Sequence, residues 1–366
     1  MLSKYSIIPS VRKIAVLRAN GLGDFIFAVP ALQALRDTYP GAEIVLLAKD
    51  WHAAFLKERP GPIDRVIVIP PVKGVAVDAD EPRILEDADE QEQFLAAMRD
   101  EEFDLAIQMH GGGRYSNPFL LRLDARMAIG LKAPDAVPLD RWVPYIYFQS
   151  EILRYLEVVS LAGARTERLE PCIAVLEQDI EEAKRVAPDR GKPLVALHPG
   201  AGSPQRRWPT EKFAAVGDAL ASAGMQIVVT GTCAECSLVE AVINSMKAEA
   251  WNLCGRLSLG GLAGLFSRCN ALISNDSGPL HLAGAVGTAS VGIYWCVNMV
   301  TAAPITRTWH RPLVSWRLAC PICGSNQIFE PCQHHASCVA DIPVEEVVGA
   351  AMELLSMGNR RGRDGD

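Results

Sequence analysis

Short apolar runs rich in β-branched residues alternate with longer stretches of helical spacing in the first half of the chain. Such runs are typical of strands that are buried on both faces of a sheet. The stretch 25–36, between the first two runs, carries apolar residues at helical spacing and predicts a helix bent at Pro30. Strands are predicted at 14–17, 43–47, 66–69, 104–109 and 127–131. Alternation of strands and helices predicts a parallel sheet covered on both faces.

The same alternation restarts in the second half of the chain. Strands are predicted at 193–197, 225–230, 271–274 and 289–294, and helices at 210–223, 259–268 and from Gly278 onward. A last helical pattern covers 344–355, and the polar, glycine-rich residues after it predict a disordered tail.

The charged stretch 165–192 separates the two halves and contains Pro171, Pro188 and Gly191. We therefore predict an N-terminal domain at 1–170, a linker at 171–192, a second domain at 193–340, and a C-terminal helix with its tail at 341–366. Two α/β halves of similar size predict two Rossmann-like domains facing a central cleft. Ligands should bind near the carboxyl ends of the strands.

Composition narrows the class of protein. Apolar residues make up 49% of the 366 residues and charged residues 22%, as in ordinary folded proteins. The 36 basic and 43 acidic residues leave a net charge of −7, which argues against general affinity for nucleic acid. No apolar run approaches the roughly 18 residues that cross a bilayer. Because basic residues also interrupt the first 24 positions, we expect no signal peptide and a cytoplasmic location.

The ten cysteines fall into two groups. Six are scattered without the spacing of a disulfide framework. The other four, Cys320, Cys323, Cys332 and Cys338, cluster around a Cys-x-x-Cys pair, with His334 and His335 among them. This pattern predicts a structural zinc or iron site, and reduced structural thiols are the alternative.

The first strand leads into the sequence Arg18-Ala-Asn-Gly-Leu-Gly-Asp24. The glycines allow a sharp turn, and Asp24 falls at the start of the next helix. Asp24 is either a helix cap or a carboxylate at the edge of the cleft that accepts a proton from a substrate hydroxyl. A dinucleotide fingerprint fits less well, because the third glycine is missing and Asp24 would repel a pyrophosphate.

Two loops in the second half carry anion-binding chemistry. The loop after residue 197 combines glycines with Ser203 and Arg206, which can bind phosphate oxygens. The sequence Asn275-Asp-Ser-Gly-Pro-Leu-His281 follows another strand. Pro279 in the first helical turn leaves the N–H groups of Ser277 and Gly278 facing a ligand, with His281 one turn further on.

These segments together resemble glycosyltransferase family 9, which comprises the ADP-heptose lipopolysaccharide heptosyltransferases and their relatives. The resemblance spans residues 12–355. Three blocks carry it: Gly23-Asp24 with Pro30-Ala31-Leu32, His198-Pro199-Gly200 through Arg206-Arg207-Trp208-Pro209, and Asn275-Asp276-Ser277-Gly278 with His281.

The resemblance implies a GT-B fold with an N-terminal acceptor domain and a C-terminal donor domain. It implies inverting transfer of a heptose or related sugar from an ADP-sugar to a saccharide or lipopolysaccharide-core acceptor, without a catalytic cofactor. Asp24 matches the family's general base, and Arg206 replaces the usual lysine at the donor phosphates. The implied donor contacts also include Ser203, Glu235, Asp276, Ser277, Gly278 and His281. Glu235 is spaced unusually.

The acceptor is less defined. Arg18, His110 and Arg114 are candidate contacts, and a flexible loop explains the glycines at 111–113 equally well. A glycolipid acceptor implies peripheral contact with the inner membrane. Two alternatives remain: a catalytically silent sugar-nucleotide-binding or assembly protein, and a nucleotide-sugar epimerase of similar architecture. A nicotinamide dehydrogenase ranks below both, since no complete G-x-G-x-x-G follows either first strand.

Overall fold

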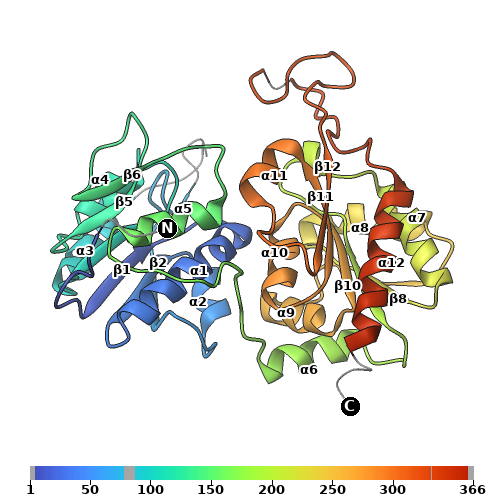
Figure 1. The fold of residues 1–366 in the computed structure, drawn as a ribbon, viewed down its shortest axis with the longest axis horizontal. Helices are drawn as coiled ribbons and strands as arrows, with labels where there is room; N and C mark the ends of the chain where they lie inside the picture. Colours follow the sequence, from blue (N-terminus) through green and yellow to red (C-terminus); the bar gives the residue numbers. More distant parts are fainter. Residues whose placement is uncertain (1–4, 78–86, 331, 362–366) are drawn as a thin grey trace. The chain divides into compact units, whose positions relative to one another are not determined.

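The chain forms two compact units, residues 1–171 and 172–366 (Figure 1). The computed structural model describes residues 5–77, 87–330 and 332–361. Each unit is built on one six-stranded sheet in which all neighbouring strands are parallel. The predicted α/β class with two Rossmann-like units is confirmed. No helix in the described ranges combines the length and the apolar character needed to span a membrane.

The sheet of the first unit has the strand order β3-β2-β1-β4-β5-β6. Its strands are β1 (Lys13–Leu17), β2 (Glu43–Ala48), β3 (Arg65–Val68), β4 (Leu105–Gln108), β5 (Ala128–Lys132) and β6 (Arg141–Pro144). Its helices are α1 (Leu22–Thr38), α2 (Asp50–Leu56), α3 (Ala88–Asp100), α4 (Ser116–Leu121) and α5 (Glu151–Ser160). The strand order reverses between β1 and β4, so the loops after these two strands meet at the switch point where open sheets bind ligands.

The sheet of the second unit has the order β12-β11-β10-β7-β8-β9. Its strands are β7 (Leu194–His198), β8 (Gln226–Val229), β9 (Ala250–Asn252), β10 (Ala271–Asn275), β11 (Ser290–Trp295) and β12 (His310–Ser315). The helices are α6 (Glu177–Val186), α7 (Thr210–Ser222), α8 (Cys236–Ser245), α9 (Leu259–Arg268), α10 (Gly278–Ala285), α11 (Cys296–Ala302) and α12 (Val344–Arg361), with 3₁₀ turns η1 (Pro204–Arg206) and η2 (Cys233–Glu235). Here the switch point lies between β7 and β10, where His198 pairs with Ser274.

The expected linker 171–192 contains helix α6, which packs against α9. The two helices approach so closely that a Cβ added to Gly264 would lie 2.1 Å from the Asp179 carbonyl oxygen. The Ile173 N–H also donates to the Ala285 carbonyl at 2.9 Å. These contacts make the stretch part of the second unit, although its charge and prolines suggested a connection.

Helix α12 covers the same unit and buries Val347, Ala351 and Leu354 in the core with α7. It continues to Arg361, beyond the predicted end of the helical pattern. The rest of the expected tail, 362–366, lies outside the described residues.

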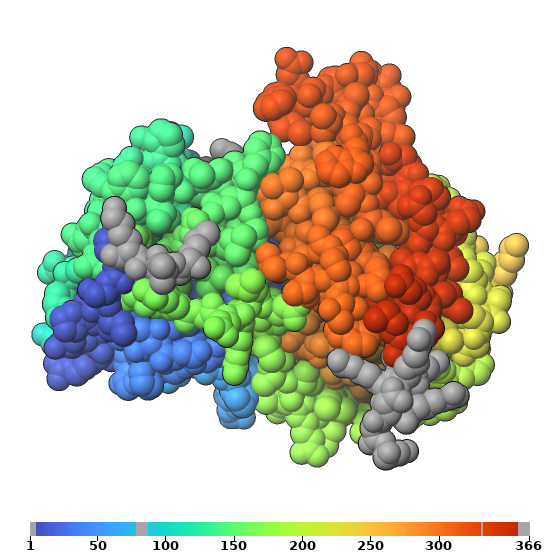
Figure 2. Space-filling model, viewed as in Figure 1, coloured from blue at the N-terminus to red at the C-terminus, as the bar shows by residue number. Residues whose placement is uncertain are grey.

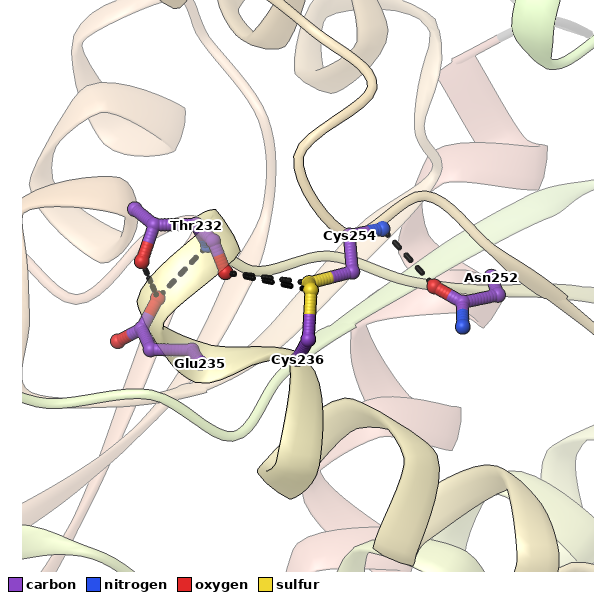
Figure 3. Close-up of a disulfide and its surroundings, with 5 residues drawn as sticks. All are labelled: Thr232, Glu235, Cys236, Asn252 and Cys254. Carbon is purple, nitrogen blue, oxygen red and sulfur yellow. Dashed lines mark hydrogen bonds between the residues drawn. A yellow bond between two sulfur atoms is a disulfide. The ribbon is translucent and has the colours of Figure 1, made fainter.

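A disulfide joins Cys236, the first residue of α8, to Cys254, which follows β9 (Figure 3). The sulfur atoms of Cys236 and Cys254 lie 3.9 and 3.1 Å from the Thr232 carbonyl oxygen. The bond therefore ties the connection after β8 to the connection after β9. Sequence spacing did not reveal this pair, because the short strand β9 that aligns the two cysteines was not recognised.

Substitution of Gly264 by Ala should destabilise the protein, because the new methyl group would collide with the α6 backbone. We expect a loss of about 1–3 kcal/mol in the free energy of unfolding. Gly349→Ala in α12 is the matched control, since nothing lies within 4 Å of its added Cβ. That change should increase the free energy of unfolding by about 1 kcal/mol, because alanine has a higher helix propensity than glycine. Urea unfolding followed by circular dichroism measures both, and equal effects of the two changes would contradict the packing described.

Loss of the disulfide should also lower stability. The bond closes a loop with a sequence separation of 18 residues, so Cys254→Ser should cost about 3 kcal/mol by the loop-entropy relation. The unpaired, exposed Cys233 provides the control variant Cys233→Ser. In urea unfolding, wild-type protein in reductant should match Cys254→Ser. A wild-type curve that is insensitive to reductant would contradict the prediction.

Candidate functional site

Asp24 lies at the carboxyl end of β1, as the third residue of α1. Its Oδ2 accepts a hydrogen bond from the Gly21 N–H at 3.1 Å, and its Oδ1 lies 3.1 Å from Arg18 Nη2. Gly21 is the helix cap, and Asp24 makes the reciprocal contact back to it. The Asp24 side chain remains 46% exposed. The carboxylate is thus held in place and still reachable from solvent.

Arg18, one of the candidate acceptor contacts, is buried beneath Asp24 with 2% of its side chain exposed. Its Nη1 donates to the Met109 carbonyl at 2.6 Å, and its Nε donates to the Asp24 carbonyl at 3.0 Å. The guanidinium also lies 4.7 Å from the centre of the Tyr155 ring. The guanidinium therefore contacts Asp24, and little of its surface remains accessible to an acceptor.

His110 follows β4 and is also buried. Its Nδ1 accepts a hydrogen bond from the Ala19 N–H at 3.3 Å, which links the loops after β1 and β4. Burial, and then the charges of Arg18 and Lys49, lower the pKa of His110 to about 3. The imidazole is therefore neutral near pH 7 and serves to join the two loops.

Arg114 differs from the other two acceptor candidates, because its side chain is 68% exposed. Gly111 and Gly113 before it adopt positive φ angles of 61° and 95°, which favour glycine. A Cβ at Gly113 would also collide with Asn117. The tight loop presents Arg114 beside Asp135, with 3.8 Å between Nε and Oδ2.

In the second unit, Asp276 is a buried carboxylate at the carboxyl end of β10, with 2% of its side chain exposed. Arg206 Nη1 lies 2.9 Å from its Oδ2, and His281 Nε2 lies 3.1 Å from its Oδ1. Burial raises the pKa of Asp276, but the contacts with His281 and Arg206 outweigh it and hold the pKa below its usual value. Three residues predicted for donor binding thus converge in one cluster.

Asn275, next to this cluster, clamps the loop that carries Arg206. Its Nδ2 donates to the Pro199 carbonyl at 2.7 Å, and its Oδ1 accepts from the Trp208 N–H at 3.0 Å. Trp208 is buried and donates from Nε1 to the Ile342 carbonyl. Within the clamped loop, the Ser203 hydroxyl is turned to the Gln205 side chain.

Helix α10 begins immediately after Asp276. Ser277 is its cap, Gly278 its first residue and Pro279 its second. The first N–H groups of a helix have no acceptor within that helix, and the helix dipole adds positive potential there. Because Arg206 lies beside the same turn and is 27% exposed, two sources of positive charge meet at this point.

Glu235 connects the loops after β7 and β8. Its Oε2 accepts hydrogen bonds from the N–H and the hydroxyl of Thr232, each at 2.9 Å (Figure 3). Its other carboxylate oxygen lies against Gly200, where an added Cβ would come within 2.0 Å. With the Glu235 side chain in this position, only glycine fits at position 200 of the His-Pro-Gly sequence.

A cavity of about 310 Å³ opens beside these loops. The volume is in the range of small-ligand pockets, and the lining is largely apolar. Its walls are formed by His198, Thr230, Gly231, Thr232, Cys233, Leu253, Gly255, Leu257, Ser258, Leu259, Leu262 and Pro279. Sequence reasoning missed most of these residues, although Ser258 caps α9 in the manner that a Ser before an apolar helix predicts.

The cysteine cluster forms with a different fourth member from the one predicted. The donor atoms of Cys320, Cys323, Cys332 and His334 all lie within 4.8 Å of one another. Cys338 is outside this group. It is buried, and its backbone N–H donates to the Gln205 carbonyl at 2.8 Å while its carbonyl accepts from the Ser315 hydroxyl. The structure thus places His334 where the predicted ligand set had Cys338.

Comparison with known proteins relates these features to a family. The model of "Glycosyltransferase family 9 (heptosyltransferase)" matches residues 92–319. Lipooligosaccharide heptosyltransferase 2 of Haemophilus ducreyi is 24% identical over 75% of this chain and 80% of its own length.

Solved structures agree on the fold. A family 9 glycosyltransferase from Veillonella parvula superposes with a TM-score of 0.76 at 21% identity, covering 98% of this chain and 99% of its own. The E. coli ADP-heptose lps heptosyltransferase II gives a TM-score of 0.73 at 18% identity, covering 95% and 99%. The predicted GT-B fold is thereby confirmed, and because the family model spans most of the chain, this protein belongs to glycosyltransferase family 9, the heptosyltransferases.

Proposed function

We propose that this glycosyltransferase moves a heptose from an ADP-sugar to a saccharide acceptor of the lipopolysaccharide-core type, with inversion at the anomeric carbon. The names of the relatives from H. ducreyi and E. coli support the sugar, the nucleotide and the acceptor class. The observation that carries the proposal is the positive turn at Arg206 and α10, which directly adjoins the cavity lined by Pro279.

The donor would occupy the second unit without a metal ion. Its nucleoside fits the apolar cavity, where Leu257, Leu259 and Leu262 can pack against a flat base. Its diphosphate follows at the N–H groups of Ser277 and Gly278, with Arg206 neutralising further charge. In this scheme Asp276 and His281 are positioning residues, because they hold the guanidinium in place.

Asp24 would act as the general base in the first unit. It removes the proton from an acceptor hydroxyl as that oxygen attacks C1 of the sugar, and the bond from C1 to the diphosphate oxygen breaks. ADP leaves with the electron pair, and its growing negative charge is stabilised at Arg206 and the start of α10. Arg18 keeps the base oriented.

The acceptor would meet the exposed Arg114, whose charge suits a phosphate or carboxylate on a core saccharide. If the acceptor is a glycolipid, the enzyme works at the cytoplasmic face of the inner membrane. This membrane location follows from the proposed acceptor class.

Asp24→Asn should reduce kcat by about 10²–10⁴ and leave the affinity for ADP unchanged, because the amide is isosteric but cannot accept the proton. Asp89→Asn, at an exposed position in the first turn of α3, is the control and should behave as wild type. Transfer is measured with ADP-heptose and a truncated core acceptor. Activity of Asp24→Asn within a few-fold of wild type would contradict the role, and donor turnover without acceptor would indicate an epimerase.

Arg206→Ala should weaken ADP binding about 10- to 100-fold, the value of one or two charge-assisted hydrogen bonds, while adenosine binding is unaffected. Calorimetric titration with ADP, UDP, GDP and adenosine, each with and without EDTA, measures this. We expect ADP to bind most tightly and EDTA to have no effect. Arg190→Ala, an exposed arginine of the same unit, is the control. Absence of nucleotide binding in folded wild-type protein would overturn the proposed donor site.

A further inference from the structure

The segment 316–338, between β12 and α12, extends away from the second unit as a long excursion (Figures 1 and 2). In the described part of this segment, β-type backbone pairing is limited to one isolated antiparallel bridge, between Ala319 and Asn326. Its large apolar side chains face outward: Trp316 is 72% exposed, Ile322 64% and Phe329 77%. Because these side chains bury little surface, hydrophobic packing contributes little to holding the excursion in shape.

A tight turn at Cys320-Pro-Ile-Cys323-Gly324 brings the first two cysteines together. The Cys320 N–H donates to the Ser325 carbonyl, and the Gly324 N–H donates to the Cys320 carbonyl, both at 2.9 Å. Gly324 has a φ of 77°, the left-handed conformation that favours glycine. The turn presents Cys320 and Cys323 from the same short hairpin.

The second half of the excursion brings Cys332 and His334 close to Cys320 and Cys323. His334 Nδ1 lies 3.4 Å from Cys332 Sγ and 4.0 Å from Cys320 Sγ. Metal–ligand bonds of about 2.3 Å to sulfur and about 2.0 Å to nitrogen place tetrahedral donors about 3.5–3.8 Å apart. No two donor atoms of the cluster lie more than 4.8 Å apart, so closure on an ion requires movements of no more than about 1 Å.

Polar groups surround the three sulfur atoms in the way that supports metal-bound thiolates. Hydrogen-bond partners of ligating groups orient them and stabilise their charged form. The Ile322 N–H donates to Cys320 Sγ at 3.5 Å, and Gln327 Nε2 donates to Cys332 Sγ at 3.4 Å. The Ser325 hydroxyl and Cys323 Sγ lie 3.2 Å apart. All three cysteines are free of disulfides.

We propose that Cys320, Cys323, Cys332 and His334 bind one Zn²⁺ ion in a closed tetrahedral site. Three thiolates and an imidazole are a structural zinc set, with no position left for water or substrate. The ion cross-links the two sides of the excursion and replaces the core that the segment lacks. This site is independent of the proposed transfer reaction, and its occupant does not take part in chemistry.

Metal analysis of the full-length protein tests the site directly. Plasma mass spectrometry should find one zinc per chain in the wild type. Cys323→Ser and His334→Asn should retain zinc at least tenfold more weakly in competition with a chelator. His335→Asn is the matched control: His335 is exposed and has a φ of 51°, a conformation that asparagine tolerates, so zinc binding should be unchanged.

Cobalt provides a second measurement that does not depend on variants. Co²⁺ added to zinc-free wild-type protein should give the intense visible bands of a tetrahedral ion and thiolate-to-cobalt absorption, both displaced by Zn²⁺. Zinc-free protein should also be cut within 316–338 by protease faster than the zinc form.

Several results would overturn the proposal. These are absence of metal together with absence of cobalt bands, a disulfide among the three cysteines in freshly purified protein, and equal zinc affinity in His334→Asn and His335→Asn. Iron bound in place of zinc would overturn the assignment of the ion.

Discussion

The second unit depends on a buried carboxylate that cannot stay unpaired. Asp276 reaches the end of the central strand β10 with its charge removed from water, and a buried charge that loses a partner costs about 3–5 kcal/mol. Arg206, in the loop after β7, contacts one carboxylate oxygen, and His281, in α10, contacts the other. The ion cluster thereby sets the position of the Arg206 loop and of the first turn of α10, which together make up the proposed diphosphate site.

The first unit also contains an arginine–aspartate pair, but there the arginine is buried and the aspartate is exposed. Arg18 is 2% exposed and Asp24 46%, whereas Arg206 is 27% exposed and Asp276 2%. In each pair the buried partner holds the exposed one, so one unit offers a carboxylate to solvent and the other offers a cation. Proton removal and phosphate binding need these two opposite charges. The two halves therefore suit different parts of one transfer reaction although they share an architecture.

Much of the fold could be predicted because the central strands are buried on both faces and form continuous apolar runs. The strands that sequence reasoning missed, β6, β9 and β12, lie at the sheet edges or are half-exposed, and their patterns lack such runs. Helix α6 was not predicted for a related reason. It is mostly charged, and it buries only a narrow face, with Asp179 and Ala183, against α9. Its packing surface could not be recognised without its partner.

The sequence by itself determined the local chemistry: the glycine turn before Asp24, the Ser-Gly-Pro start of α10, the clustered cysteines and the family to which these motifs belong. Neighbours along the chain decide such features, so the order of residues is sufficient. Only the tertiary structure decided that Arg18 is buried, that Cys236 pairs with Cys254, and that His334 rather than Cys338 joins the cysteine cluster. Each of these depends on which distant loops meet, and that is set by strand order and packing rather than by spacing along the chain.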